Sequence, residues 1–412
     1  MVDPDEMATL EYIPTIPKFL EFIKKQYSDY PAISDKVTTY TYEELVSRVA
    51  KRVTFINSLG LEKGSNIAVL AKNDLDAMEL FLAIPAAGHV LIMLPNALND
   101  KALAGISMKF DLAGMFVGKE FTEVTANLPC KTWSSTSIGE TESTFADVEK
   151  DTTAAIFFTG GTTGAPKGAV HSHGSIMRGS FNGVFGPGSI LHKRYIAMLP
   201  LSHIFGAIMG YMAKLYTGSL TYTCTDMRAG IGDIPVVRPT TLVLVPGLVE
   251  IILNIAKLKG RAFLGDLELI MCGAAPVPPR QMEECRELGI TLCAGYGLTE
   301  CANLTSGNCD TDKKPESMGH IYPEQQVKVV DGELWIKGDN VMKEYYKDPE
   351  HTAEVLEDGW FKTGDLVEFD DNDWIYITGR IKNLIILPNG ENVSPEEIEE
   401  LFYKQPLSLI HI

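Results

Sequence analysis

The stretch TGGTTGAPKG, residues 159–168, has the residue types of a loop that binds phosphates. Its glycines let backbone amides approach an anion closely, its threonines add hydroxyl donors, and Lys167 adds a positive charge. It is not a Walker A loop, because Pro166 precedes the lysine and Gly168 follows it, where that motif has glycine and then serine or threonine. By composition alone it also suits a surface loop of small residues, so its surroundings decide the interpretation.

Five further stretches follow this loop. They are PLSHIFG (200–206), CGAAPV (272–277), GYGLTE (295–300), DGWFKTGDL (358–366) and GRIKNLIILPNGENVSPEEIE (379–399). With them, TGGTTGAPKGAVHSH resembles the signature of the adenylate-forming, AMP-binding acyl-CoA synthetases, and it is most similar to the fatty acyl-CoA ligases. Each fragment is a weak signal by itself, but six in the family's order cover most of the chain.

The resemblance implies a reaction that uses ATP, magnesium and coenzyme A. A carboxylate attacks the α-phosphorus of ATP, pyrophosphate leaves, and the thiol of coenzyme A then attacks the acyl adenylate. Because two anions meet in the first step, the site must neutralise charge and hold the reactants in line. By resemblance, Thr299 would contact the α-phosphate and Glu300 would bind magnesium as a hard oxygen ligand. The β and γ phosphates would be held by Thr159, Gly160, Gly161, Thr162, Thr163, Gly164 and Lys167.

The adenosine contacts also come from the resemblance. Asp365 would accept hydrogen bonds from both ribose hydroxyls, Arg380 would assist it, and Tyr296 would stack on adenine. The remaining contacts would come from Gly273, Ala274, Ala275, Pro276 and Gly297. Outside these motifs, the same residue types would be read as a turn aspartate, a surface arginine, a core tyrosine and tight turns.

Two more residues match positions with special roles in the family. His203 matches a histidine that stands between the carboxylate pocket and the thiol tunnel, although a lone histidine among apolar residues is more often a core residue. Lys382 matches the hinge about which a small C-terminal domain rotates. Such a domain has ~100 residues, whereas 30 residues follow Lys382 here. No residue among them matches the family's adenylation lysine, so we expect a truncated domain and low activity.

Composition limits the remaining classes of function. The chain has 412 residues, 45% of them hydrophobic and 22% charged, which fits two or three folding units of an ordinary globular protein. Its formal charge of −18 would repel a nucleic acid backbone. The acidic N-terminal segment lacks the basic and then apolar order of a signal peptide. The long apolar stretches are interrupted by polar residues, glycine or proline, and no two of the seven cysteines form a C-x-x-C motif. We therefore expect a cytoplasmic protein with no membrane span and no nucleic acid partner.

Short apolar runs separated by helical patterns predict an α/β fold with mainly parallel sheets. The runs are residues 67–70, 90–94, 154–158, 242–245 and 269–271. Helical patterns cover residues 19–23 and 42–59, and a capping box begins at Ser394. From about residue 319 to 381, short strands joined by turns predict a β-rich subdomain. We expect residues 1–381 to form one large domain, made of two α/β subdomains and this β-rich subdomain. We expect residues 382–412 to be the start of a small α+β domain.

Three functions remain open. The first is an acyl-CoA ligase, and the second is an adenylation module that loads an acyl carrier protein or activates an amino acid. An amino-acid module has a Phe-Asp pair where this chain has Ser202, His203 and Ile204. The third is a nucleotide-binding protein without turnover. The small Gly295 and the segment GYGLTECA favour a medium or long aliphatic acid as the substrate.

Overall fold

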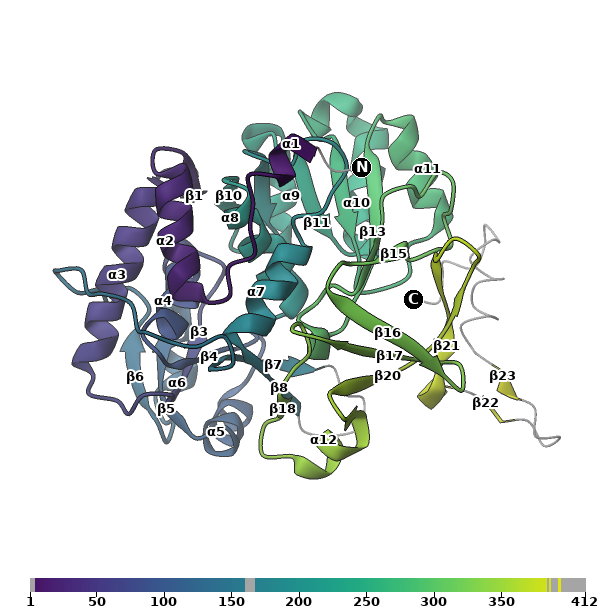
Figure 1. The fold of residues 1–412 in the computed structure, drawn as a ribbon. Coiled ribbons are helices and arrows are strands. Elements are labelled where there is room, and N and C mark those ends of the chain that lie inside the picture. Colours follow the sequence, from purple (N-terminus) through teal and green to yellow (C-terminus); the bar gives the residue numbers. More distant parts are fainter. Residues whose placement is uncertain (1–3, 160–166, 384, 387–391, 394–412) are drawn as a thin grey trace.

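The computed structural model describes residues 4–159, 167–383, 385–386 and 392–393. Its largest sheet has seven strands in the order β18-β8-β7-β4-β3-β5-β6 (Figure 1). They are β3 (Asn66–Leu70), β4 (Val90–Met93), β5 (Leu112–Val117), β6 (Lys131–Ser134), β7 (Thr153–Thr159), β8 (Lys167–Ser172) and β18 (Glu344–Tyr345). Strands β3 to β7 pair in parallel, and β8 and β18 add antiparallel pairs at one edge. All residues of β3 and β4 are buried, which is why these strands are continuous apolar runs in the sequence.

Two smaller sheets also have parallel centres. One has the order β2-β1-β10-β9 and the other β11-β12-β13-β14-β15. Their strands are β1 (Pro31–Ser34), β2 (Thr39–Thr41), β9 (Arg194–Ala197), β10 (Leu220–Thr223), β11 (Thr241–Leu244), β12 (Leu269–Cys272), β13 (Thr291–Tyr296), β14 (Ser306–Asn308) and β15 (His320–Ile321). The antiparallel strands β2, β14 and β15 lie toward the sheet edges. The expected α/β fold with mainly parallel sheets is confirmed.

The later part of the chain forms an antiparallel sheet, as the turn-rich sequence predicts. Its strands are β16 (Gln325–Val330), β17 (Glu333–Gly338), β19 (Leu356–Glu357), β20 (Trp360–Phe369) and β21 (Ile375–Arg380). A separate pair joins β22 (Ile385–Ile386) and β23 (Asn392–Val393). The capping box predicted at Ser394 lies outside the described residues. In Figure 1 the antiparallel sheet lies on the opposite side of the molecule from α2 and α3.

The helices pack mainly against the sheets and against one another. They are α1 (Pro4–Met7), α2 (Ile16–Tyr27), α3 (Tyr42–Ser58), α4 (Leu75–Ala86), α5 (Asp100–Lys109), α6 (Thr122–Thr125), α7 (His173–Asn182), α8 (Ala213–Tyr216), α9 (Met227–Val237), α10 (Pro246–Lys259), α11 (Pro279–Glu287) and α12 (Pro349–Val355). Short 3₁₀ turns are η1 (Lys119–Phe121), η3 (Arg261–Leu264), η4 (Thr299–Cys301) and η5 (Ile381–Asn383), and η2 (Phe205–Met212) is a π-helix. Within the described residues, no helix combines the length and apolar character needed to cross a bilayer.

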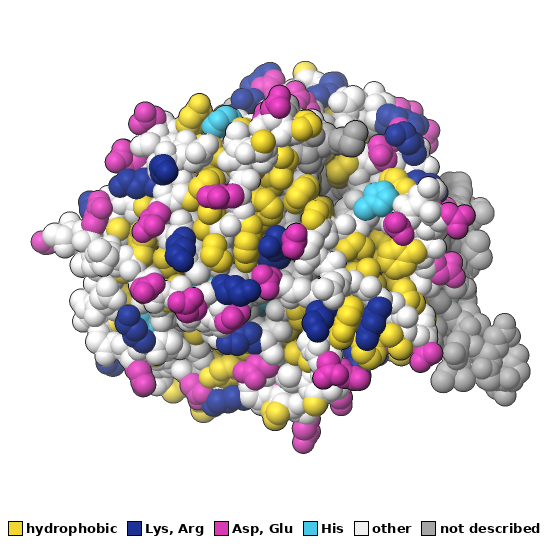
Figure 2. All heavy atoms as spheres, in the orientation of Figure 1, with side chains coloured by type: hydrophobic (Ala, Val, Ile, Leu, Met, Phe, Trp, Pro, Cys, Tyr) yellow, Lys and Arg dark blue, Asp and Glu magenta, His cyan; other side chains and the backbone are white. Residues whose placement is uncertain are grey.

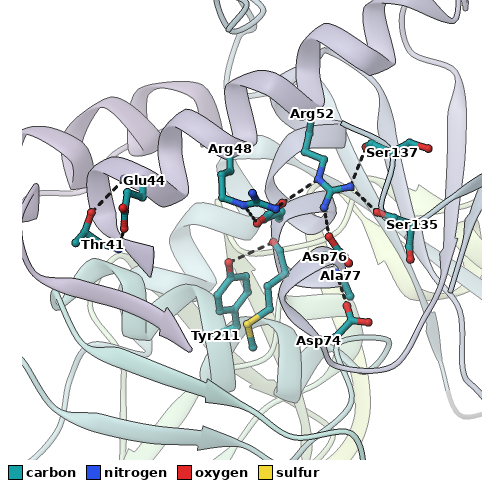
Figure 3. Close-up of polar contacts among 12 residues, drawn as sticks. Thr41, Glu44, Arg48, Arg52, Asp74, Asp76, Ala77, Ser135, Ser137 and Tyr211 are labelled. Atoms are coloured by element: carbon teal, nitrogen blue, oxygen red, sulfur yellow. Dashed lines mark hydrogen bonds and ion pairs between the residues drawn. The ribbon is translucent and has the colours of Figure 1, made fainter. Parts of the chain in front are cut away.

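A buried ionic network ties α3 to α4 and, through a neighbouring residue, to the π-helix (Figure 3). Arg52 and Glu79 are both fully buried, with Arg52 Nε 2.9 Å from Glu79 Oε2, and Arg52 also pairs with Asp76. The hydroxyl of Tyr211, in η2, donates to the carbonyl oxygen of Met78 beside this network at 3.2 Å. Removing one partner of a buried ion pair costs roughly 3–5 kcal/mol, so the network holds α3 against α4, while the Tyr211 hydrogen bond links η2 to α4.

Charges are mixed on the surface of this acidic protein. On the face drawn in Figure 2, acidic and basic side chains are interspersed, and apolar side chains lie between them. Over the antiparallel sheet, Lys328 Nζ lies 4.4 Å from the ring centroids of both Trp335 and Trp360. This face is therefore not uniformly acidic, although the chain has a net charge of −18.

Candidate active site

The hairpin of β7 and β8 positions both ends of the phosphate-type loop. Thr159 ends β7, Lys167 begins β8, and the two are paired across the hairpin. Four consecutive buried residues, 154–157, anchor β7 in the sheet. Five predicted loop residues lie outside the described residues: Gly160, Gly161, Thr162, Thr163 and Gly164. The structure thus places Thr159 and Lys167 side by side at the base of this loop.

Glu300 and Lys167 meet at a tyrosine. The hydroxyl of Tyr345 donates to Glu300 Oε1 at 2.7 Å, and Lys167 Nζ lies 5.1 Å from the centroid of the same ring. Tyr345 is only 6% exposed, and burial and then the charge of Glu300 hold the pKa of its hydroxyl well above its usual value. Tyr345 contacts only Oε1 of Glu300, so the hydroxyl leaves Oε2 available to a cation, for which a carboxylate oxygen is a suitable ligand.

A buried histidine fixes the turn that carries Thr299 and Glu300. The Nε2–H group of His171 donates to the carbonyl oxygen of Thr299 at 2.8 Å, and Nδ1 lies 3.1 Å from Ser175 Oγ. Burial lowers the pKa of His171 to about 4, so the ring is neutral at pH 7. Because a neutral imidazole that donates from Nε2 accepts at Nδ1, both ring nitrogens are used, and the turn is held at a defined place next to β8.

Asp365, Tyr296 and Arg380 form a cluster where β20 and β21 approach the end of β13. Asp365 and Arg380 are paired across the two strands, and Arg380 Nε lies 2.6 Å from Asp365 Oδ1. The Tyr296 hydroxyl donates to Asp365 Oδ2 at 2.6 Å. Asp365 is 1% exposed, and burial raises the pKa of its carboxyl while the charge of Arg380 opposes this effect. The carboxylate is therefore held from two sides, by the Arg380 guanidinium at Oδ1 and by the Tyr296 hydroxyl at Oδ2.

The loop after β12 approaches the end of β13. A Cβ placed at Gly273 would lie 3.1 Å from the carbonyl oxygen of Gly295 and 3.4 Å from Phe205 Cζ, so a side chain there would displace the loop. Ala274 has a φ of +65°, a left-handed conformation that turns the chain outward. Residues 274–276 are exposed, so their backbone is free to contact a ligand.

Two glycines in GYGLTE differ in their surroundings. A Cβ at Gly297 would lie 1.3 Å from the carbonyl oxygen of Asn303, so this glycine is required by packing. A Cβ at Gly295 would meet only ordinary contacts, with Leu304 Cδ2 the nearest atom at 3.5 Å. Position 295 therefore has room for a Cβ, but neighbouring atoms at 3.5–3.9 Å enclose that position.

His203 lies just before the π-helix. Its Nδ1 accepts a hydrogen bond from the backbone N–H of Phe205 at 3.2 Å. The residue is exposed to solvent, yet nearby protein atoms lower the pKa of its side chain by desolvation. His203 is therefore mainly neutral at pH 7, and π-helical segments such as the one that follows it occur often at functional sites.

Lys382 is an exposed residue of η5, directly after β21. Arg380, two residues earlier, contacts Asp365. The predicted hinge therefore begins where the chain leaves the Asp365 cluster. Its rotation remains a prediction.

Two residues that shape this site were missed from the sequence, His171 and Tyr345. His171 lies inside the motif TGGTTGAPKGAVHSH, so the pair of histidines in that motif was an available signal. Tyr345 lies in EYYKDPE, which carries no comparable signal. It reaches Glu300 only because β18 pairs with β8, with Tyr345 opposite Ala169.

Residues 20–346 match the family described as "AMP-binding enzyme". The feruloyl-CoA synthase of an Amycolatopsis species is 28% identical over 391 residues, which cover 90% of this chain and 79% of that protein. The 2-succinylbenzoate–CoA ligase of Listeria monocytogenes is 28% identical over 367 residues, or 88% and 77% of the two chains.

Solved structures show the same fold. The O-succinylbenzoate coenzyme A synthetase of Bacillus subtilis in complex with AMP superposes with a TM-score of 0.83 at 22% identity, over 95% of this chain and 84% of that one. ATP-bound MatB of Rhodopseudomonas palustris gives a TM-score of 0.83 at 26% identity, over 93% and 82%. The similarity thus extends over most of the chain in both sequence and structure.

Proposed function

The chain belongs to the AMP-binding enzyme family, and from this premise we propose that it is an AMP-forming acid–thiol ligase. In the proposed reaction, ATP activates a carboxylic acid to an acyl adenylate, and the acyl group passes to coenzyme A. The observation that carries the proposal is the Asp365 cluster, in which Arg380 and Tyr296 hold a buried carboxylate in place. Each carboxylate oxygen has a second lone pair, which could accept a hydrogen bond from a vicinal diol such as that of a ribose.

The Asp365 cluster fits the adenosine part of ATP. Arg380 pairs with Asp365 Oδ1 and the Tyr296 hydroxyl donates to Oδ2, so both oxygens are fixed in position. Each hydrogen bond from a hydroxyl to a charged carboxylate is worth roughly 1.5–3 kcal/mol. We propose that both ribose hydroxyls bind here and that the adenine ring lies near Tyr296, over the exposed loop of residues 274–276.

The residues around Tyr345 fit the phosphates of ATP. In the proposal, Lys167 and Thr159 hold the β and γ phosphates with the loop between them, and Thr299 contacts the α-phosphate. Glu300 fits a magnesium ion because Tyr345 holds one carboxylate oxygen and leaves the other available. Among the described residues, no group of three or more acidic, histidine or cysteine side chains could hold a metal ion. We therefore propose that magnesium is bound by one carboxylate together with phosphates and water. When bound, this ion would neutralise charge on the phosphates.

The chain's own residues account for both half-reactions in outline. In the first, an oxygen of the acid bonds to the α-phosphorus and the bond to pyrophosphate breaks, and the positive charge of Lys167 offsets the negative charge that leaves. In the second, the thiol sulfur bonds to the acyl carbon and AMP leaves. His203 would line the passage between the acid and the thiol, and its neutral form places no extra charge there.

The identity of the carboxylic acid is a more specific proposal than the type of reaction. We propose a medium or long aliphatic acid, because the segment GYGLTECA resembles the fatty acyl members of the family. The relatives named above are a feruloyl-CoA synthase and a 2-succinylbenzoate–CoA ligase, so aryl acids belong in the same screen. A carrier protein in place of coenzyme A is the alternative acceptor.

A cytoplasmic location also remains a proposal, supported by the absence of disulfides, since all seven cysteines are free.

Domain organisation is a proposal too. We propose that residues 1–381 form the nucleotide-binding unit and that Lys382 begins the hinge. Nucleotide binding should depend on the residues before the hinge, since the matched ATP residues all precede Lys382.

Isothermal titration calorimetry with ATP and magnesium tests the proposed function. We expect binding below the millimolar range, and we expect Glu300→Lys to remove most of the magnesium-dependent part. Glu123→Lys, on exposed α6, is the matched control and should bind as the wild type does. A folded wild-type protein that does not bind ATP would refute the proposal. An ATP–pyrophosphate exchange screen across aliphatic and aryl acids would then identify the substrate.

A further inference from the structure

Cys293 and Cys309 form a thiol pair across two neighbouring strands. Cys293 lies in β13, and Cys309 directly follows β14. The antiparallel register pairs Ala294 with Asn308, so the next position along both strands sets Cys293 opposite Cys309. Directly opposite residues of an antiparallel pair point to the same face of the sheet, with Cβ atoms about 4.5–5.5 Å apart. The two thiols are accordingly hydrogen-bonded to each other.

This arrangement suits a disulfide bond. A disulfide needs Cα atoms about 4.4–6.8 Å apart and Cβ atoms about 3.5–4.5 Å apart. Opposite positions of an antiparallel pair meet the first range and lie at the edge of the second. Both cysteines are free in the structure. Forming the bond would therefore need only a small movement of two side chains, on strands that are already paired.

The two thiols differ in exposure and in acidity. Cys293 is buried, whereas Cys309 is the more exposed residue of the pair. The hydrogen bond from the Cys293 thiol lowers the pKa of Cys309, while burial and the charge of Asp310 oppose this effect. The same hydrogen bond, together with burial, holds the pKa of Cys293 well above its usual value. Because the thiolate is the nucleophile, Cys309 is the thiol that reacts first.

We propose that Cys293 and Cys309 are a site of reversible oxidation, at which hydrogen peroxide joins the two residues in a disulfide. In the first step the Cys309 sulfur bonds to one peroxide oxygen and the O–O bond breaks, which gives a sulfenic acid and one water. In the second step the Cys293 sulfur bonds to the Cys309 sulfur, the S–O bond breaks and a second water leaves. Two thiols are oxidised by two electrons, the peroxide is reduced, and both thiol protons end in the waters.

The bond would close residues 293–309 into a covalent loop that carries part of the proposed nucleotide site. Tyr296, Thr299 and Glu300 all lie within this loop. A cross-link stabilises mainly by restricting the unfolded chain, and a loop of this length should raise the Tm by about 3–6 °C. Because β13 and β14 are already paired, the folded positions of these three residues should change little. Oxidation therefore protects this segment against unfolding and leaves nucleotide binding intact.

Mass spectrometry of the full chain tests this assignment. The protein is treated with a slight molar excess of hydrogen peroxide, and its mass is measured before and after dithiothreitol is added. We expect a product about 2 Da lighter, which dithiothreitol returns to the starting mass. For mapping, chymotrypsin cuts after Tyr296 and Leu304. Cys293, Cys301 and Cys309 are then on separate peptides, and the disulfide should join the first and the third.

Variants separate this pair from the other thiols. Cys309→Ser and Cys293→Ala should each abolish the linked product. Cys130→Ser is the matched control, because it removes a partly exposed cysteine before β6, and it should form the product as the wild type does. The oxidised wild type should have the higher Tm and should bind ATP and magnesium within about threefold of the reduced protein.

Several results would overturn the proposal. The assignment of the pair is wrong if peroxide leaves the wild type unchanged, adds oxygen to Cys309 without forming the bond, or links another pair. It is also wrong if Cys309→Ser still forms the same product. A linked protein with an unchanged or lower Tm, or with lost ATP binding, would refute the protective effect. Failure of the proposed function is distinct, because it would appear as a reduced wild type that does not bind ATP.

Discussion

Replacing Lys214, a buried residue of α8, by methionine should make the folded protein more stable. The pKa of Lys214 falls from the ordinary 10.5 to about 7 because burial disfavours the ammonium form. One pKa unit corresponds to ~1.4 kcal/mol, so the full difference of about 3.5 units is worth about 5 kcal/mol. At pH 7, where half of the folded molecules carry the proton, the cost is about 4 kcal/mol. Methionine has a similar shape, adds no charge and suits the neighbours of this side chain, which are the Met271 sulfur and the Tyr195 ring.

The effect should depend on pH in a defined direction. Between pH 7 and 10.5 the unfolded chain keeps a proton at Lys214 that the folded protein has lost, so the wild type gains stability as the pH rises. The cost of Lys214 should therefore fall from about 4 kcal/mol at pH 7 to about 1 kcal/mol at pH 10. Urea unfolding of the wild type and of Lys214→Met at both pH values measures this change, because other titrating groups affect both proteins alike.

Two results would refute this reasoning. If Lys214→Met is no more stable than the wild type at pH 7, the lysine is not desolvated in the folded protein. If the stability difference is the same at pH 7 and pH 10, it does not arise from the proton on Lys214. Lys193→Met, which removes a partly exposed lysine near Lys214, should change the free energy of unfolding by less than ~1 kcal/mol at either pH.

Three further predictions concern the nucleotide site and turnover. Asp365→Ala should weaken ATP binding by ~2 kcal/mol or more in calorimetry, whereas Asp371→Ala, in an exposed turn, should be nearly silent. Tyr345→Phe keeps the ring beside the loop but removes the hydroxyl that holds Glu300, so it should raise the magnesium concentration needed for half-maximal ATP binding about threefold to tenfold. The control Tyr346→Phe should leave that concentration unchanged, and an equal shift in both variants would contradict the role of Tyr345. Extending the chain with a related C-terminal domain should raise acyl-CoA formation 100-fold or more, and equal rates for both forms would show that no further domain is needed.

Several elements were predictable because local physics determines them. The run at residues 67–70 appears as β3 and that at 154–158 as β7, since strands buried on both faces need apolar residues at every position. The helix expected at residues 42–59 begins after Thr41, whose side chain and Glu44 form a capping box. Such signals lie within a few residues of one another, and tertiary context did not override them.

The order of strands in the sheets was not predictable in the same way. Hydrophobic periodicity shows which residues are buried, but it does not show which strand lies next to which. The pairing of β18 with β8 is an example, because it joins segments that are far apart in the sequence. That pairing brings Tyr345 to Glu300, 45 residues away along the chain.

The family and the residue types available for chemistry could be read from the motifs around Lys167, Glu300 and Asp365, because these motifs are short and contiguous. How the residues are held follows from the fold, which brings Arg380 and Tyr296 to Asp365 and lets Tyr345 link Glu300 to Lys167. The fold also decides that Lys214 is buried, which no local pattern shows. The physical reason is that burial and hydrogen bonding depend on atoms brought together by packing of distant segments, whereas a motif records only neighbours along the chain.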